Sequence, residues 1–322
     1  MNKCRICGNK DYNTKYNIKE MLHGTFEDFE YFECNNCGCL QILKYPHNIE
    51  KYYPEDYLSF KISEVKSDNF IISYLRKFKA GYQIGLNNNI LGFILSKISK
   101  ESYEKKLFPA NIGFDSKILD VGSGFGRRLI SMAKKGFNNL TGTDIFIKEN
   151  INYSNGVKIL KTELSEINEK YDFIMLNHVL EHMPNQKKVI SNLYKLLNPQ
   201  SFLMVRIPVK SEYIWKNYRE NWVQIDAPRH FYLHTERSFR ELIKNTSFIL
   251  KEIIYDSSEF QFVGSIQNQS NILLRGENSY YVNPKKSIFS KRQIRQFRSE
   301  AIKLNQKNMG DMACFYLFKG EI

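Results

Sequence analysis

Four of the six cysteines occur as two C-x-x-C pairs, Cys4 and Cys7 in "CRIC" and Cys34 and Cys37 in "CNNC". Two thiolates at this spacing bind one metal ion from a tight turn, and two such turns complete a tetrahedral zinc site. Disulfides are the first alternative, and they are rare in a cytoplasmic chain. A redox motif is the second, and it needs a thioredoxin-like context. We expect structural zinc, because four protein ligands leave no position open for water.

The stretch "SKILDVGSGFGRRLI", residues 116–130, places an acid before a glycine-rich turn that brings the backbone close to a ligand. Asp120 at this turn would repel a pyrophosphate, and Arg127 replaces the third glycine of a dinucleotide fingerprint. S-adenosylmethionine carries an ammonium and a sulfonium instead, so it meets no such repulsion. A tight turn in another α/β fold is the alternative. The predicted cofactor residues at this turn are Asp120, Gly122, Ser123, Gly124 and Gly126.

Three further polar residues follow predicted strands. Asp144 ends "NNLTGTDIF", about 20 residues beyond the glycine turn, where a carboxylate binds ribose hydroxyls. Glu163 follows the apolar run 157–160, and Asn177 follows the run 171–176. Ligands of parallel sheets bind at the carboxyl ends of the strands, so we expect these side chains to converge on one edge. The remaining predicted cofactor residues are Asp144, Ile145, Glu163 and Asn177.

Four of the six histidines fall in two short motifs, "HVLEHMPN" and "DAPRHFYLHT". Histidine has the unperturbed pKa that suits a general base near neutral pH, and methyl transfer to a hydroxyl benefits from one. We predict that His182 is the base, with His230 the next candidate and Glu181 orienting an imidazole. A structural or solvated histidine is the alternative for each.

The acid followed by G-x-G-x-G resembles motif I of class I methyltransferases, and "HVLEHMPN" resembles their loop after the fourth strand. The stretches "NWVQIDAPRHFYLHTERSF" and "YYPEDYLSF" resemble a subgroup linked to bacterial surface-glycan synthesis. The resemblance covers nearly the whole chain, most firmly residues 116–245. It implies methyl transfer from S-adenosylmethionine to a nucleotide- or lipid-linked sugar, most readily at a hydroxyl oxygen. The predicted acceptor residues are His178, Asp226, Arg229 and Tyr57, with a buried ion pair as the alternative for Asp226 and Arg229.

Other functions stay open. The acceptor atom could be a sugar carbon or a phosphate-type oxygen, which is already ionised and needs no base. Zinc modules also precede some RNA methyltransferases, but the [ND]-P-P-[YF] motif typical of base-amino methylation is replaced here by "NHVLEHMPN". A non-catalytic cofactor-binding scaffold is the last alternative, and the intact glycine turn and Asp144 argue against it.

The predicted fold is α/β: a Rossmann-like, mostly parallel sheet whose last strand, 312–319, is antiparallel, preceded by a small zinc ribbon. We assign residues 1–47 to the zinc module and 48–110 to a helical and aromatic connector and lid. Residues 111–322 form the methyltransferase domain, with an insertion at about 257–309. A helix in that insertion has one apolar face and one strongly basic face.

The composition of the chain limits the kinds of molecule that the protein is expected to bind. The chain has 322 residues, 42% of them hydrophobic, and a formal net charge of +13. The excess is mostly lysine, which favours a solvated surface over nucleic-acid binding, although it would suit a phosphate-bearing substrate. No run of about 18 apolar residues and no apolar leader is present, so we expect a cytoplasmic protein without a membrane span. Peripheral membrane contact through the basic segment 285–307 is left open.

Overall fold

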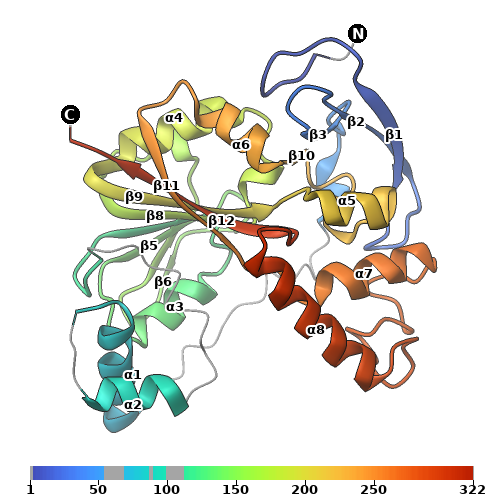
Figure 1. The fold of residues 1–322 in the computed structure, drawn as a ribbon. Helices are drawn as coiled ribbons and strands as arrows, with labels where there is room; N and C mark the ends of the chain where they lie inside the picture. The colour runs from blue at the N-terminus through green and yellow to red at the C-terminus, as the bar shows by residue number, and fades with distance from the viewer. Residues whose placement is uncertain (1–2, 54–68, 87–89, 99–111, 322) are drawn as a thin grey trace.

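The computed structural model describes residues 3–53, 69–86, 90–98 and 112–321, which fold around two β-sheets (Figure 1). In the larger sheet, five neighbouring strands are parallel, and antiparallel strands flank them on both sides. Its strands in spatial order are β11 (Phe248–Tyr255), β12 (Met312–Lys319), β9 (Leu197–Pro208), β8 (Tyr171–Asn177), β4 (Ile118–Val121), β5 (Leu140–Thr143), β7 (Lys158–Leu160) and β6 (Ile151–Asn152). The expected Rossmann-like sheet with an antiparallel last strand is confirmed: β12 lies between β9 and β11.

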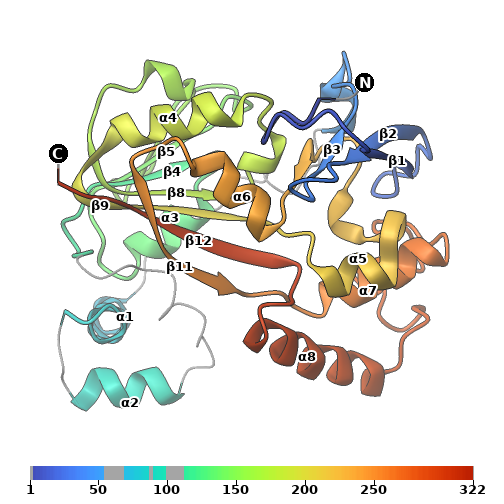
Figure 2. The same ribbon diagram turned by 45° about the horizontal axis from the view of Figure 1, so that its top comes forward.

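Helices cover both faces of this sheet (Figures 1 and 2). One face carries α3 (Arg127–Ala133), and the other carries α4 (Gln186–Leu196) and α6 (Glu236–Ile243). All four residues of β4 are buried, as its apolar sequence predicts for a central parallel strand. The register pairs Asp120 of β4 with Met175 of β8, so the carboxyl ends of these strands lie side by side. Polar residues that follow them therefore share one edge.

The smaller sheet belongs to the predicted zinc module, residues 1–47, and is completed from far along the chain. Its order is β1 (Thr14–Lys19), β2 (Asp28–Glu33), β3 (Leu40–Ile42) and β10 (Tyr232–Leu233). Between the two cysteine motifs the chain forms the antiparallel pair β1 and β2. The pairing of β10 with β3 was not expected, and it joins the module to the segment that carries His230.

The connector contains the two expected helices, α1 (Phe70–Gln83) and α2 (Ile90–Ile98). Lys77 of α1 lies over the ring of Phe114, which precedes β4, at 5.1 Å. In both views α1 and α2 lie away from the zinc module (Figures 1 and 2). Whether the connector forms a lid stays a prediction, because residues 54–68, 87–89 and 99–111, including the predicted acceptor residue Tyr57, lie outside the described residues.

The carboxyl end of the sheet is flanked by α5 (Glu212–Tyr218) and by the insertion, which contains α7 (Phe260–Gln269) and α8 (Lys291–Gln306). Ile294, Ala301 and Leu304 form the buried face of α8, as its spacing predicts. Ser290 caps the helix by accepting a hydrogen bond from Gln293 N. Within the described parts of the chain, no helix has the length and apolar character needed to cross a bilayer.

Candidate active site

The glycine turn closes tightly between β4 and the loop that follows β8. Gly122 N and Ser123 N both donate to the carbonyl of Thr143, at 2.7 and 3.0 Å. Gly122 has φ 68°, and a Cβ at this position would lie 2.5 Å from Cγ2 of Val179. Glycine is therefore required here, and it lets the turn contact the loop that carries His178 and His182.

Two carboxylates flank the turn. Asp144 accepts hydrogen bonds from Gly124 N at 2.9 Å and from Phe146 N at 2.8 Å. Asp120 is buried, and this burial raises its pKa to about 7; the Arg128 charge opposes the rise, and the Asp144 charge adds to it. A buried carboxylate whose pKa is raised favours a positively charged ligand, because such a ligand stabilises its ionised form.

The other predicted cofactor residues differ in position. Asn177 ends β8 and accepts a hydrogen bond from Arg206 at 3.5 Å, so it lies at the same edge as Asp120. Ile145 is exposed beside Asp144. Glu163 is exposed and caps a 3₁₀ turn, Leu164–Glu166. Contact of these three residues with a cofactor stays a prediction.

His182 and His230 come together, with their ring centroids 4.7 Å apart. His182 Nδ1 lies 2.8 Å from the carbonyl of Arg229, and His230 Nδ1 lies 2.7 Å from the carbonyl of Gln224. A carbonyl oxygen only accepts hydrogen bonds, so each Nδ1 carries the proton and, in the neutral ring, each Nε2 carries the lone pair. His230 Nε2 lies 3.8 Å from Asp226 Oδ2. Tyr53 also contacts His182 Nδ1 through its hydroxyl, at 3.0 Å.

The environment keeps His182 in its neutral form. Burial, and then the neighbouring His230, lower the pKa of His182. A neutral imidazole with a free Nε2 is the form that accepts a proton or binds a metal ion. His234 has a structural role instead, because it is fully buried and hydrogen-bonded to Ser238 and Gln186.

Asp226 and Arg229 form the buried ion pair that was left open as an alternative. Arg229 has no exposed surface, and its guanidinium contacts Asp226 at 2.5 Å and Glu20 at 3.3 Å. Glu20 in turn accepts hydrogen bonds from four backbone amides of residues 22–25. The network joins the zinc module to the segment before His230. A direct contact of Asp226 or Arg229 with an acceptor stays a prediction.

A cavity of about 490 Å³ adjoins the cluster of Glu181, His182 and His230, although none of these three residues lines it. Its lining residues His178 and Gln224 touch the cluster directly: His178 Nδ1 lies 3.4 Å from Glu181 Oε1, and Gln224 O accepts from His230. This volume falls in the range of small-molecule binding sites. Seven of the nine lining residues are polar or charged, and the full set is His178, Arg206, Gln224, Asp256, Ser257, Ser258, Phe260, Asp311 and Met312.

Sequence reasoning missed three charged residues of this cavity. Arg206 Nε donates to Asp256 Oδ2 at 2.7 Å, and Asp311 Oδ2 accepts from Trp222 Nε1 at 3.0 Å. An arginine inside the apolar run "FLMVRIPV" was an available signal, since a charged residue in a central strand needs a partner. Asp256 directly follows β11, the same position that drew attention to Asp144.

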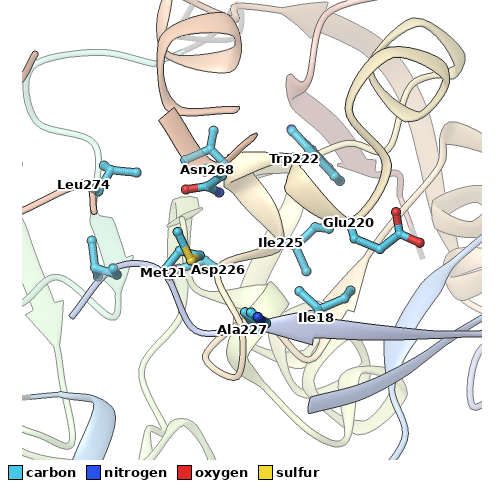
Figure 3. A pocket seen from close by; sticks show the side chains of 12 residues that line it. Ile18, Met21, Glu220, Trp222, Ile225, Asp226, Ala227, Asn268 and Leu274 are labelled. Atoms are coloured by element: carbon cyan, nitrogen blue, oxygen red, sulfur yellow. The ribbon is translucent and has the colours of Figure 1, made fainter. Parts of the chain in front are cut away.

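A second cavity lies where the zinc module, residues 220–227 and the insertion meet (Figure 3). Ile18, Trp222 and Leu274 are among its lining side chains. Its volume of about 20 Å³ admits one water-sized molecule and is too small for a methyl acceptor. The larger cavity is therefore the candidate acceptor site.

The four predicted zinc ligands converge. The Sγ atoms of Cys4, Cys7, Cys34 and Cys37 all lie within 4.8 Å of one another, with Cys4–Cys37 at 3.7 Å and Cys7–Cys34 at 3.5 Å. Tetrahedral zinc with Zn–S bonds of about 2.3 Å requires sulfurs roughly 3.8 Å apart, so the cluster fits this ion. The distances exceed a disulfide bond, and Cys39 lies outside the cluster.

Comparison with known proteins agrees with this geometry. Residues 95–251 match the family model described as "Methyltransferase domain". The chain is 26% identical over 168 residues to the ubiquinone biosynthesis O-methyltransferase of Rickettsia bellii (strain OSU 85-389), covering 46% of this chain and 69% of the relative. The corresponding enzyme of Rickettsia canadensis (strain McKiel) is 28% identical over 162 residues, covering 44% and 68%. A solved S-adenosylmethionine-dependent methyltransferase from Archaeoglobus fulgidus is similar with a TM-score of 0.39 and 18% identity, covering 64% of this chain and 86% of that one.

The strand order and the family match together define a class I S-adenosylmethionine-dependent methyltransferase domain. The protein is accordingly an enzyme that transfers a methyl group from S-adenosylmethionine.

Proposed function

We propose that this enzyme methylates a hydroxyl oxygen of a saccharide, carried on a nucleotide or lipid, in the synthesis of a cell-surface glycan. The observation that carries the proposal is the cavity of about 490 Å³ lined by His178 and Gln224, which contact Glu181 and His230. In this proposal the methyl group of the donor reaches the cavity from the glycine turn. That turn packs against Val179, which lies in the loop that carries His178 and His182.

The cofactor is assigned to the opposite side of that loop. Asp120 pairs with the ammonium group, and Asp144 binds the ribose hydroxyls in exchange for its present bond to Gly124 N. The free backbone groups of the glycine turn supply the remaining contacts. This arrangement places the sulfonium near the end of β8, where Asn177 and His178 lie.

The lining of the cavity supports a hydroxylated acceptor. Hydroxyl groups of an acceptor can form hydrogen bonds with the side-chain oxygens of Asp256, Asp311, Ser257 and Ser258. Phe260 contributes an aromatic ring to the same lining. Two carboxylates beside one arginine disfavour a phosphate-type oxygen as the reacting atom, because like charges repel. The names of the Rickettsia relatives also favour oxygen as the methylated atom.

The acceptor hydroxyl has to lose its proton during transfer, and His182 is placed to promote this. The acceptor oxygen attacks the methyl carbon, the carbon–sulfur bond breaks, and its electron pair stays on sulfur. The free Nε2 of His182 is the atom through which this residue takes the proton, as the sequence predicts, or holds an ion that acidifies the hydroxyl. Glu181 and His230 complete the catalytic set.

Zinc at Cys4, Cys7, Cys34 and Cys37 is proposed as a structural ion. Its closed thiolate set leaves no position for a substrate. The module that it folds supplies Glu20 and Tyr31, which contact Arg229 and the carbonyl of His230. The ion would thus fix the backbone around the catalytic histidines.

The acceptor is tested by incubating the enzyme with isotope-labelled S-adenosylmethionine and three sets of acceptors: sugar nucleotides, lipid-linked sugars and polyprenyl phenols. Mass spectrometry should show a gain of one methyl on a sugar of the first or second set. Methylation confined to the phenols would instead assign the enzyme the acceptor class named for its Rickettsia relatives, and the saccharide proposal would be withdrawn.

A further inference from the structure

Glu181 is a buried carboxylate whose side-chain oxygens accept no hydrogen bond from the described residues. Its side chain has no exposed surface. The nearest donor is His178 Nδ1, 3.4 Å from Oε1. A buried charge left in this state is costly, and a cation bound beside it would stabilise the carboxylate.

Two imidazoles face the same place. One nitrogen of His182, one of His230 and one oxygen of Glu181 lie within 4.8 Å of one another. Both rings donate their Nδ1 proton to a backbone carbonyl, that of Arg229 and that of Gln224. Histidines that bind metal ions typically fix their second nitrogen in this way, which leaves Nε2 for the ion.

We propose that Glu181, His182 and His230 bind a divalent transition-metal ion, separate from the zinc at the four cysteines. Two nitrogens and one carboxylate oxygen suit ions such as Mn²⁺, Fe²⁺, Co²⁺ or Zn²⁺. Three protein ligands leave positions open, which is the pattern of catalytic metal sites, whereas the four-cysteine site is closed.

We place the open positions toward the acceptor cavity, because His178 lines that cavity and lies 3.4 Å from the proposed ligand Glu181. This part of the inference rests on the proposed function. An acceptor hydroxyl that coordinates the ion has a lowered pKa, so its proton leaves to water at neutral pH. The oxygen then attacks the methyl group as before, with His182 serving as a ligand.

The test titrates Mn²⁺ into the zinc-loaded, full-length enzyme and follows the free ion by electron paramagnetic resonance. Mn²⁺ prefers oxygen and nitrogen ligands, so it should not replace zinc at the thiolates. The wild type is compared with Glu181→Gln, His230→Asn and Glu30→Gln. Glu30 of β2 is exposed and pairs with Lys15 of β1, which makes Glu30→Gln a matched control for the loss of a carboxylate.

We expect one bound Mn²⁺ in the wild type and in Glu30→Gln. In Glu181→Gln and His230→Asn the affinity for Mn²⁺ should fall about tenfold or more, because losing a ligand costs at least as much as losing a group that orients one. Binding of S-adenosylhomocysteine should persist in all four proteins, which shows that each is folded. Equal binding of Mn²⁺ by all four proteins would overturn the proposed site. A wild type that binds neither Mn²⁺ nor Co²⁺ would also overturn it.

The two proposals fail separately. Methyl transfer to a saccharide by a protein that binds no such ion would remove the metal site and return the proton to His182 as the base. A bound ion without saccharide methylation would retain the site and remove the acceptor.

Discussion

The proposed active site has a cofactor half and an acceptor half, and the two are built in different ways. The cofactor half, comprising Asp120, residues 122–126 and Asp144, comes from two consecutive strand–turn units, and Gly124 and Asp144 are 20 residues apart. The acceptor half joins distant segments: Tyr53 to His182 across 129 residues, Tyr31 to His230 across 199, and Glu20 to Arg229 across 209. Local sequence therefore specifies the first half, whereas the second half depends on the zinc module.

The sharpest way to separate the halves is to remove the zinc. Cys34→Ser should abolish zinc binding and unfold the module, because structural zinc contributes on the order of 10 kcal/mol to the folding of such sites. Methyl transfer should be lost, while S-adenosylhomocysteine still binds, since no module residue contributes to the cofactor half. Metal analysis and calorimetry measure both.

Cys39→Ser is the control for this experiment, because Cys39 lies outside the metal cluster and should leave the zinc content unchanged. Less than about a tenth of an equivalent of zinc in freshly purified wild type would contradict the zinc site, given how tightly such sites bind. Parallel loss of cofactor affinity would show that the halves are not independent.

The next largest effect is expected within the acceptor half. His182→Ala should lower turnover by about 10² to 10⁴, the range for loss of acid–base activation of the nucleophile. Cofactor affinity and thermal stability should change little, because His182 is only partly buried and is not among the predicted cofactor residues. Single-turnover kinetics with labelled donor would measure the loss. A turnover that stays within about tenfold of wild type would assign the role to His230.

In the cofactor half, Asp144→Ala should weaken binding of S-adenosylhomocysteine by about 1–3 kcal/mol, the value of a lost hydrogen bond to a charged group. Isothermal titration calorimetry measures the change. Glu163→Ala is the informative partner variant, because Glu163 is exposed and caps its own turn. A similar loss there would support its predicted role in cofactor binding; unchanged affinity would reject it.

The smallest effect is a pH dependence. Burial raises the pKa of Asp120 to about 7, so below this pH a cationic ligand must displace a proton from the carboxyl group. Affinity for S-adenosylhomocysteine should therefore fall as the pH is lowered from about 7.5 to 5.5, by at most about tenfold per unit. Asp120→Asn should bind more weakly and lose most of this slope. An affinity independent of pH in wild type would contradict the pairing of Asp120 with the ammonium.

The contrast between the cofactor half and the acceptor half also explains which features the sequence could predict. The parallel strands, the last antiparallel strand and the cysteine cluster follow from apolar runs and from spacing, which are local signals. β10 has two residues and no pattern of its own, so its pairing with β3 had no signal in the sequence. Glu20 likewise looked like an ordinary surface acid, because its partner Arg229 becomes adjacent only in the folded chain.

The strand β10 also constrains the order in which the protein forms during synthesis. The zinc module leaves the ribosome first, but the outer edge of β3 has no neighbour until residues 232–233 have been made. Until then the module exposes an open strand edge, which is a site for pairing with other chains. Early zinc binding would hold the cysteine turns together before this edge is paired. Assembly of the module is thus a late event for the first part of the chain, and a nascent protein arrested before β10 should be prone to aggregation.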